Sequence, residues 1–182
     1  MKIVTVGRGR IGGGLAAMWS KAGHEVATLG RDGGDGSAAD VVLVAVPGPA
    51  IAAALANVTG IAGKVTIDAT NTLGQRSAQF ASLAHEVKSI IGGPTAKAFN
   101  TNFAVLYDHL GQQQPRPSNL LAADPDARKV AEQLIVDAGF DPVFVGDLAH
   151  ARLLEDHLRL IQAVASAGLG PFFYRMAGPG RL

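Results

Sequence analysis

The chain has 182 residues, of which 48% are hydrophobic, and a formal net charge of +1. This length fits one domain with a sizeable core, and the near-neutral charge offers no basic patch, so we expect neither a nucleic-acid nor a membrane partner. The absence of cysteine excludes disulfides, thiolate nucleophiles and cysteine-based zinc sites. No apolar run approaches the about 20 residues of a membrane span. The N-terminus lacks a signal-peptide pattern, so the expected location is cytoplasmic.

The first part of the chain alternates short strand patterns with one helix pattern. The run Val41–Val46 is continuously apolar and is stopped by Pro47, which is typical of a central strand covered on both faces. Gly23 closes the helix pattern at a plausible C′ position. The predicted elements are strands at Lys2–Val6, Glu25–Leu29 and Val41–Val46 and a helix at Ile11–Ala22.

The same alternation continues to the C-terminus, which favours a parallel sheet wrapped by helices. Gln112–Pro117 is a short low-complexity segment and is predicted to be an exposed loop. The predicted helices are Ala50–Ala56, Ser77–Val87, Ala127–Ala138 and Arg152–Ala165, and the predicted strands are Val65–Ala69, Thr95–Phe99, Asn119–Ala122 and Pro142–Val145. Asn71–Gly74 is predicted to be a loop, and Phe172–Met176 follows the last helix.

The link between the second and third of these strands is short. Only the eleven residues Gly30–Asp40 separate Leu29 from Val41. Eleven residues span at most about 36 Å, against roughly 27–30 Å needed to return along a strand and step across two strand spacings. A helix and a further strand do not fit in this link. We therefore predict that Glu25–Leu29 is an edge strand, that Gly33–Gly36 is mobile, and that the adenine side of any nucleotide site is open.

Six residues after the first strand match a dinucleotide-binding fingerprint. Gly7-Arg8-Gly9-Arg10-Ile11-Gly12 has the pattern G-x-G-x-x-G, follows a strand and opens a helix, which is the required context. Its first glycine permits the tight turn, the second lets the backbone approach a diphosphate, and the third lets the helix pack on the strand. The diphosphate would bind the free N–H groups at the helix N-terminus. The expected fold class is therefore α/β, a Rossmann-type doubly wound and mainly parallel sheet, with a shortened second-strand crossover and a C-terminal helix.

The end of the second strand favours NADP over NAD. NAD sites usually place a carboxylate there to bind the ribose 2′-hydroxyl. Here that position is Gly30, and Arg31 follows. A guanidinium can bind a 2′-phosphate through two charge-assisted hydrogen bonds, and Arg8 can approach the same phosphate. Asp32 offers an alternative, because it can pair with Arg31 or bind the ribose itself, and Arg31 can equally be a solvated loop residue.

Several segments together resemble NADPH-dependent coenzyme F-420 reductases, also called F-420-dependent NADP oxidoreductases. The most specific is Lys97-Ala98-Phe99-Asn100-Thr101, which also occurs in the NADPH-oxidising domain of six-transmembrane metalloreductases. The resemblance spans nearly the whole chain. It implies a homodimer that passes a hydride between NADPH and a deazaflavin or flavin. The other segments that carry it are Val4–Gly14, Ala22–Val26, Ala45–Pro47, Asp68–Asn71, Asp137–Phe140 and Ala151–Glu155.

The resemblance also implies roles for individual residues. Gly30 and Arg31 stand where the family commonly has Ser-Arg, so one phosphate-binding hydroxyl is missing. The short second-strand loop and the bulky cations Arg8 and Arg10 are further departures, and either can mean an altered acceptor. The residues implied to hold the diphosphate are Gly7, Gly9, Arg10, Ile11 and Gly12; Val46 and Pro47 would flank the nicotinamide; Asn71, Ala98, Phe99 and Asn100 would line the hydride-transfer cleft.

Plainer roles are open for several of these polar residues. Asn71 and Asn100 can orient a carboxamide or an acceptor carbonyl, or they can cap backbone groups. Lys97 can meet an anionic tail of the acceptor, or it can be a solvated residue at a strand end. Glu155 is expected on a solvated helix face. The five histidines form no metal-ligand pattern, so no metal site is expected.

We therefore expect residues 1–182 to form a single NADP-binding domain, with a dinucleotide-binding part at 1–110 and a C-terminal strand–helix extension at 111–182. The leading hypothesis is an NADP(H)-dependent oxidoreductase whose acceptor is coenzyme F-420 or a flavin. One alternative is a reductase of a small imine or carbonyl compound, similar to pyrroline-5-carboxylate reductase, although little chain follows Asp147 for the helical bundle of that family. The other is a non-catalytic NADP(H) sensor. The expected partners are a small-molecule acceptor and a second copy of the chain.

Overall fold

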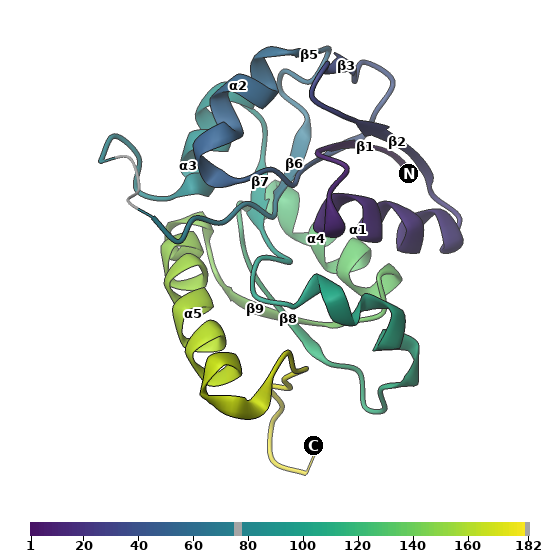
Figure 1. Cartoon of the computed structure of the whole chain (residues 1–182). Helices are drawn as coiled ribbons and strands as arrows, with labels where there is room; N and C mark the ends of the chain where they lie inside the picture. The colour runs from purple at the N-terminus through teal and green to yellow at the C-terminus, as the bar shows by residue number, and fades with distance from the viewer. Residues whose placement is uncertain (75–77, 181–182) are drawn as a thin grey trace.

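The computed structural model of the chain describes residues 1–74 and 78–180. Strands and helices alternate along it (Figure 1). The strands are β1 (Lys2–Val6), β2 (Glu25–Leu29), β3 (Gly34–Asp35), β4 (Val41–Val44), β5 (Val58–Thr59), β6 (Val65–Asp68), β7 (Thr95–Lys97), β8 (Ser118–Ala123) and β9 (Asp141–Gly146). The α-helices are α1 (Arg10–Lys21), α2 (Ile51–Ala56), α3 (Leu83–Ile91), α4 (Pro125–Asp137) and α5 (Ala151–Val164), and the shorter or tighter helices are η1 (Gly48–Ala50), η2 (Ala104–Gln112), η3 (Leu148–His150) and η4 (Ala165–Leu169).

Among the described residues, seven strands form one sheet in the order β2-β1-β4-β6-β7-β8-β9. Neighbouring strands are parallel except β7 and β8, which are antiparallel. The chain moves outward from β1 to β2 and then returns to β4 on the other side of β1. In open α/β sheets, ligands bind outside the carboxyl ends of the strands at such a point of reversal. The expected Rossmann-type α/β fold is confirmed.

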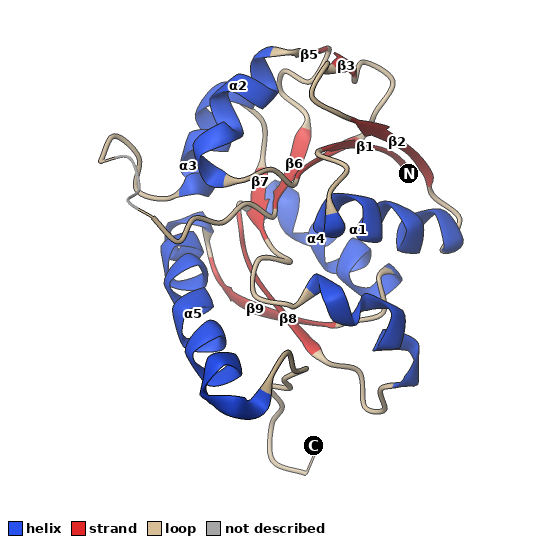
Figure 2. Ribbon diagram, in the orientation of Figure 1, coloured by secondary structure: helices blue, strands red, loops and turns tan. Residues whose placement is uncertain are grey.

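Helices cover both faces of the sheet (Figure 2). Alternate residues of β4 explain why: Val41 and Leu43 pack in a core with α1 and α4, whereas Val42 and Val44 pack with α2 and α3. All four side chains are buried. A strand covered on both faces needs apolar residues at every position, which is what the continuous apolar run predicted.

The short link after β2 has the predicted consequence for the sheet. β2 is an edge strand that pairs with β1 alone, and the link contains no helix. The Gly33–Gly36 segment, which we expected to be mobile, contains β3, which pairs in parallel with β5 in a separate small sheet. Gly34 donates to Asn57 O at 3.0 Å and Gly36 donates to Thr59 O at 2.8 Å. Backbone pairing with the segment after α2 therefore holds the link in place.

Some element boundaries differ from the sequence prediction. The helix expected at Ser77–Val87 begins at Leu83, where the Ser82 hydroxyl caps it by accepting from the backbone N–H of His85; Ser77 lies outside the described residues. β7 ends at Lys97 because Phe99 adopts a positive φ of 60°, which no strand accommodates. The helix η2 was not predicted at all. Its apolar residues are spaced for a tighter helix, and Tyr107 and Leu110 are buried.

The C-terminal part continues the same sheet and does not form a separate layer. β8 and β9 extend it, and α5 packs Leu154 against Leu120 and Ala122 of β8. The segment after η4 returns along β8, where Ser118 donates its backbone N–H to Tyr174 O at 2.9 Å. Within the described residues, every helix is too short or too polar to traverse a lipid bilayer.

Candidate functional site

The glycine loop between β1 and α1 has the geometry that the fingerprint predicted. Gly7 has φ +106°, and a Cβ there would overlap the backbone of Ala45, the residue that follows the neighbouring strand β4. A Cβ at Gly12 would overlap the carbonyl of Gly7. A Cβ at Gly9, in contrast, would meet nothing within 4 Å. The first and third glycines are therefore required by the protein's own packing, whereas the second borders open space that a ligand can approach.

The N-terminus of α1 opens onto that space. Gly9 precedes the helix in an extended conformation, no side chain caps it, and the first turn contains no acidic residue. The first backbone hydrogen bond of the helix runs from Gly13 N to Gly9 O at 2.7 Å. The N–H groups of Arg10, Ile11 and Gly12 precede this bond and have no carbonyl partner within the helix. Such a terminus attracts anionic groups.

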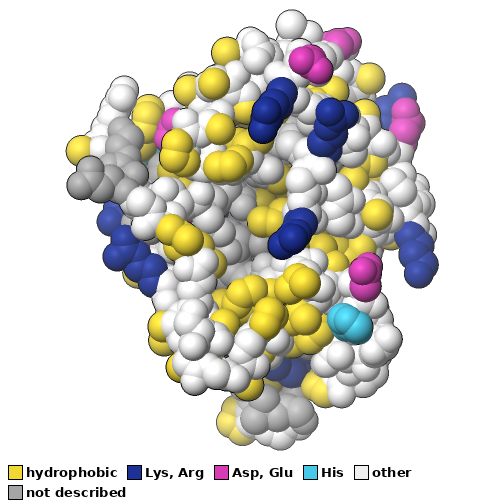
Figure 3. All heavy atoms as spheres, viewed as in Figure 1, with side chains coloured by type: hydrophobic (Ala, Val, Ile, Leu, Met, Phe, Trp, Pro, Cys, Tyr) yellow, Lys and Arg dark blue, Asp and Glu magenta, His cyan; other side chains and the backbone are white. Residues whose placement is uncertain are grey.

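Two cations lie at the end of β2, beside this terminus. A Cβ at Gly30 would stand 3.0 Å from both Cζ and Nε of Arg8, so the guanidinium of Arg8 lies over Gly30. Arg31 is exposed, and neither arginine forms an ion pair with a carboxylate of the described residues. The pair between Arg31 and Asp32 that we considered from the sequence is not formed. Figure 3 shows basic side chains gathered around the hollow in this face of the molecule.

A cleft of about 560 Å³ adjoins the glycine loop at the carboxyl ends of the strands. It brings together five residues predicted from the sequence: Arg10, Ile11, Pro47, Asn71 and Asn100. The loop after β4 and the loop after β6 are joined here, because Gly48 donates its N–H to Asn71 O at 2.9 Å. The opposite walls come from η2 and α5, which the sequence did not predict as parts of the site. The remaining lining residues are Pro49, Thr72, Leu73, Asn102, Phe103, Ala104, Val105, Leu158 and Gln162.

Asn71 and Asn100 form a hydrogen-bonded pair at the base of the cleft. Asn71 Nδ2 donates to the backbone carbonyl of Asn100 at 2.6 Å, and Asn100 Nδ2 donates to Asn71 Oδ1 at 3.2 Å. Asn100 Nδ2 also donates to Leu154 O of α5 at 2.9 Å. Because backbone carbonyls only accept, both amide orientations are fixed. These amides thus hold the cleft walls together, as in the capping alternative, and still line the cleft.

Three other residues expected at the cleft do not line it. Ala98 and Phe99 are fully buried in the core on the α1 side. The ring of Phe99 packs edge-on against Trp19 and Phe140, with centroids 5.7 Å and 6.3 Å apart. The positive φ of Phe99 turns its side chain into this core while the chain carries Asn100 to the cleft. Val46 is half-buried against the core on the α2 and α3 side.

Lys97 is neither solvated nor available to an acceptor, which corrects both sequence interpretations. It is fully buried, with Nζ 2.8 Å from Asp68 Oδ2 and 3.4 Å from Glu155 Oε1. Glu155, expected on a solvated face, is buried as well, and its Oε1 accepts from Leu83 N at 2.8 Å. One sequence signal was available. Asp68 and Lys97 each end a strand, and the carboxyl ends of parallel neighbours meet at one edge.

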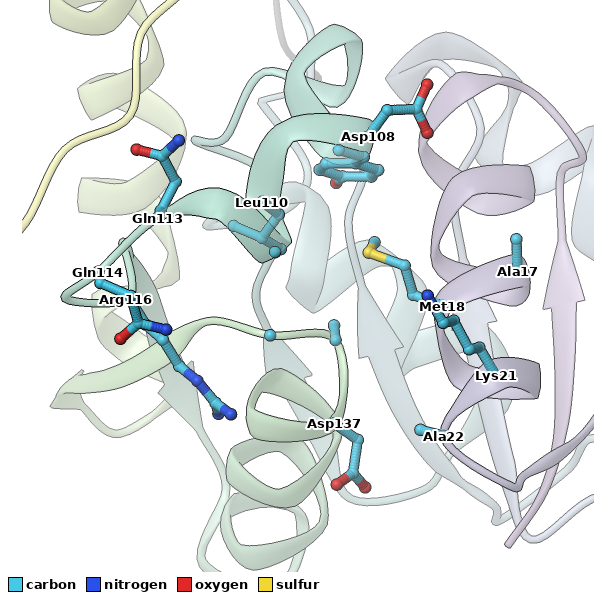
Figure 4. Close-up of a pocket in the computed structure, with 14 residues that line it drawn as sticks. Ala17, Met18, Lys21, Ala22, Asp108, Leu110, Gln113, Gln114, Arg116 and Asp137 are labelled. Atoms are coloured by element: carbon cyan, nitrogen blue, oxygen red, sulfur yellow. The ribbon is translucent and has the colours of Figure 1, made fainter.

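A second hollow of about 550 Å³ lies at the other end of α1, between η2 and the end of α4. Figure 4 shows Met18 and Leu110 turned toward each other across it, while the carboxylates of Asp108 and Asp137 point away from its middle. Burial raises the pKa of the neighbouring Tyr107 above its ordinary range, so this phenol stays protonated. The hollow is about 18 Å, the length of α1, from the glycine loop. Its polar groups do not converge on one point, so we do not assign it to the site.

The charges of the cleft are few. Arg10 is the only ionisable side chain among the described residues that line it. Nor do the described residues contain a group of three histidine, aspartate or glutamate side chains placed to hold a metal ion. The arrangement can bind an anionic group at the helix terminus and a planar ring between apolar walls and amides. It offers no carboxylate or imidazole for proton transfer from those lining residues.

Comparison with known proteins gives structural matches only. Neither a protein-family model nor a curated protein matches the sequence. A protein from Arthrobacter sp. FB24, provisionally described as an F-420-dependent NADP-reductase, superposes with a TM-score of 0.81 and 24% identity over 98% of this chain and 100% of that chain. A hypothetical protein from Sinorhizobium meliloti gives 0.61 and 25% over 81% and 85% of the two chains.

An imine reductase from Streptomyces aurantiacus gives a TM-score of 0.69 and 16% identity, covering 92% of this chain and 63% of that chain. This chain therefore corresponds to less than two thirds of that enzyme. At these identities the matches establish the Rossmann-like α/β fold.

Proposed function

We propose that the protein is an NADP(H)-dependent oxidoreductase that transfers hydride between NADPH and a deazaflavin, coenzyme F-420, or a flavin-like acceptor. One observation carries the proposal more than any other. The uncapped N-terminus of α1 faces open space at Gly9, and two guanidinium groups without carboxylate partners among the described residues stand beside it at the end of β2.

The residues present fit NADP(H). The diphosphate would be held by the N–H groups of Arg10, Ile11 and Gly12, and Gly9 leaves the space for its approach. Arg8 and Arg31 would bind the 2′-phosphate, and Gly30 stands at the position where NAD sites usually have a carboxylate. Pro47 and Asn71 would contact the nicotinamide side, at the reversal point of the sheet.

The cleft suits direct transfer between two rings. When bound, NADPH supplies the hydride from its nicotinamide ring. The chain's contribution is to stack and orient the two rings at near-attack distance, which needs no acid or base from the protein. The apolar side chains of η2 and α5 supply flat walls, and Asn71 and Asn100 supply fixed amides. Solvent at the cleft mouth supplies the proton that the reduced acceptor takes up.

The full-length likeness to the Arthrobacter protein supports coenzyme F-420 as the acceptor, whereas the Lys97–Thr101 segment marks the wider group of NADPH-oxidising proteins and no single acceptor. The likeness to imine reductases favours a second candidate, reduction of a small imine. A cleft without an acid among its described lining residues suits an iminium substrate, which arrives already protonated. The imine reductases, however, have more than a third of their length outside the match, whereas the Arthrobacter protein is matched throughout.

Anaerobic mixing tests these candidates. Purified protein is mixed with NADPH and, separately, coenzyme F-420, riboflavin phosphate or a cyclic imine, and the near-ultraviolet absorbance of NADPH is followed. Oxidation of NADPH by coenzyme F-420 or the flavin supports the proposal, and oxidation by the imine alone supports the second candidate. Tight binding of NADPH without turnover of any of them contradicts both and identifies a non-catalytic NADP(H)-binding protein.

We also propose that the protein pairs with a second copy through α5. Leu153, Leu160 and Val164 are exposed on this helix, and Leu169 follows in η4. The three helical positions are seven and four residues apart and therefore share one face. Light scattering during gel filtration should give the mass of a dimer, and Leu160→Glu should give a monomer. A wild-type monomer at every concentration tested contradicts this pairing.

A further inference from the structure

Lys97 is a buried cation that the proposed hydride transfer does not use. Its ammonium contacts three oxygen atoms: Asp68 Oδ2 at 2.8 Å, the backbone carbonyl of Thr70 at 2.6 Å, and Glu155 Oε1 at 3.4 Å. Asp68 and Thr70 lie at the end of β6 and in the loop after it, and Glu155 lies on α5. The Lys97 ammonium therefore connects the loop after β6 with α5, two segments that line the cleft.

Two of these oxygens belong to residues that are next in the chain to Asn71 or to Leu154, the hydrogen-bond partner of Asn100, and Asp68 is linked to Thr70. Thr70 precedes Asn71, and its own N–H donates to Asp68 Oδ1 at 2.8 Å. Leu154, whose carbonyl accepts from Asn100, precedes Glu155. The hydrogen bonds of the pair therefore involve Asn71 and Leu154, each of which is next in the chain to a residue that Lys97 contacts.

The same contact sets the position of the α5 wall. Leu158 and Gln162 line the cleft and follow Glu155 by three and seven residues, on the same helix face. Glu155 also accepts from Leu83 N at the start of α3, which fixes the helix from a second side. A change in the Lys97–Glu155 distance would therefore move the ring-binding wall relative to Asn71.

We propose that Lys97 is a positioning residue that fixes the width of the cleft and the orientation of the Asn71 and Asn100 amides. Stability alone does not account for it, because well-packed apolar side chains replace buried ion pairs with little loss or even a gain of stability. A buried ammonium fixes the positions of the oxygen atoms that it contacts, which an apolar side chain does not do. The expected effect on kcat rests on the proposed hydride transfer. The expected orientation of the two amides does not depend on it.

The first test measures the side-chain amides of the asparagine pair by NMR. The side-chain N–H signals of Asn71 and Asn100 are assigned by NMR, and their exchange with solvent is measured in wild type and in Glu155→Gln. This substitution keeps an oxygen for Leu83 N and removes the charge. We expect faster exchange and shifted signals at both asparagines. Unchanged signals and exchange would overturn the proposal, whatever the reaction of the protein.

A neutral triple variant covers the case in which single substitutions do not fold. Lys97→Met, Asp68→Asn and Glu155→Gln together leave no unpaired buried charge. The matched control is Lys88→Met, which removes a half-exposed ion pair with Asp124, 2.7 Å long, on the far end of α3. We expect disordered amides in the triple variant and wild-type amides in the control. A folded triple variant with wild-type amide signals would overturn the proposal.

The second test separates positioning from folding. In a protein that oxidises NADPH, misplacing the rings by about 1 Å costs on the order of a hundred-fold in kcat. We therefore expect Glu155→Gln to lower kcat strongly while the dissociation constant of NADPH, set at the glycine loop, stays that of wild type. Equal losses of kcat and NADPH binding would indicate a merely structural role and would overturn the positioning role. If wild type does not oxidise NADPH, the proposed function fails, and the amide measurement still decides this inference.

Discussion

The guanidinium of Arg8 lies over Gly30, so that a Cβ at position 30 would stand 3.0 Å from Arg8 Nε and Cζ. The family that the sequence resembles is expected to have a serine at this position, next to the arginine that corresponds to Arg31. In this chain the cation from the glycine loop fills the space of the missing hydroxyl. A side chain at position 30 would therefore press on the Arg8 guanidinium, which would have to shift to make room for it.

Restoring the serine should consequently weaken the site. We expect Gly30→Ser to displace the Arg8 guanidinium and to reduce the affinity for NADPH, although it adds a hydroxyl. In an Arg8→Ala background the same substitution should be neutral or favourable. Calorimetric titration of the four proteins gives the coupling free energy, which we expect to be about 1 kcal/mol. Additive effects would show that the two positions act independently.

Arg31 should discriminate between the two dinucleotides. Arg31→Ala removes charge-assisted hydrogen bonds to a 2′-phosphate, which are each worth about 1.5–3 kcal/mol. We expect a loss of that size in NADPH affinity and no change in NADH affinity, measured by fluorescence titration. Arg116→Ala, in an exposed loop beside the second hollow, is the control. An Arg31→Ala protein with wild-type NADPH affinity would mean that Arg31 is a solvated loop residue.

Substitution of two glycines of the fingerprint should have different effects, one on NADPH binding and the other on stability. Gly9 has a negative φ of −74° and open space above it, so Gly9→Ala should fold normally and lose NADPH binding. Gly12→Ala would press a methyl group on the Gly7 carbonyl and should destabilise the fold by about 1–3 kcal/mol or more. Urea unfolding and NADPH titration of both variants separate the effects. Retained NADPH affinity in Gly9→Ala would contradict diphosphate binding at this loop.

The buried cluster around Lys97 should be sensitive to the loss of one partner. Lys97→Met leaves Asp68 and Glu155 without their common cation, and breaking a buried pair in this way costs about 3–5 kcal/mol. Lys88→Met breaks a half-exposed pair and should cost about 0–1 kcal/mol. Denaturant unfolding provides both values. Similar losses in the two variants would contradict the burial of Lys97.

Stability should fall in mild acid because of His157. Burial lowers its pKa below the ordinary 6.5, and Nε2 has no hydrogen-bond partner among the described residues. The unfolded chain then binds a proton more readily than the folded one, so stability is complete above pH 6.5 and declines as the pH falls toward the lowered value. His157→Phe keeps an aromatic ring against Tyr174, 6.1 Å away. Urea midpoints above and below pH 6.5 should differ less in this variant than in wild type.

Short sequence patterns predicted the parts of the fold that depend on residues close together in the chain. The glycine spacing, the apolar run before Pro47 and the short link after Leu29 each reflect constraints within a few residues, and the loop, the central strand β4 and the edge strand β2 follow from them. The glycine-loop half of the candidate site was accessible to sequence reasoning for the same reason.

The rest of the site depends on contacts between distant segments. Asn100 bonds to Leu154, 54 residues away, and Leu83 bonds to Glu155, 72 residues away. No pattern near Lys97 distinguishes a solvated strand-end lysine from one that α5 covers. Phe99 shows the same limit, because it combines a positive φ with ring packing against Trp19 and Phe140, which lie 80 and 41 residues away in the sequence.

A crystal structure of the protein grown with NADPH would show whether the dinucleotide binds at the glycine loop. We expect the diphosphate on the N–H groups of Arg10, Ile11 and Gly12 and the 2′-phosphate between Arg8 and Arg31. A dinucleotide bound elsewhere, or a glycine loop closed by Arg8 and Arg10 with no nucleotide at saturating concentration, would contradict this expectation.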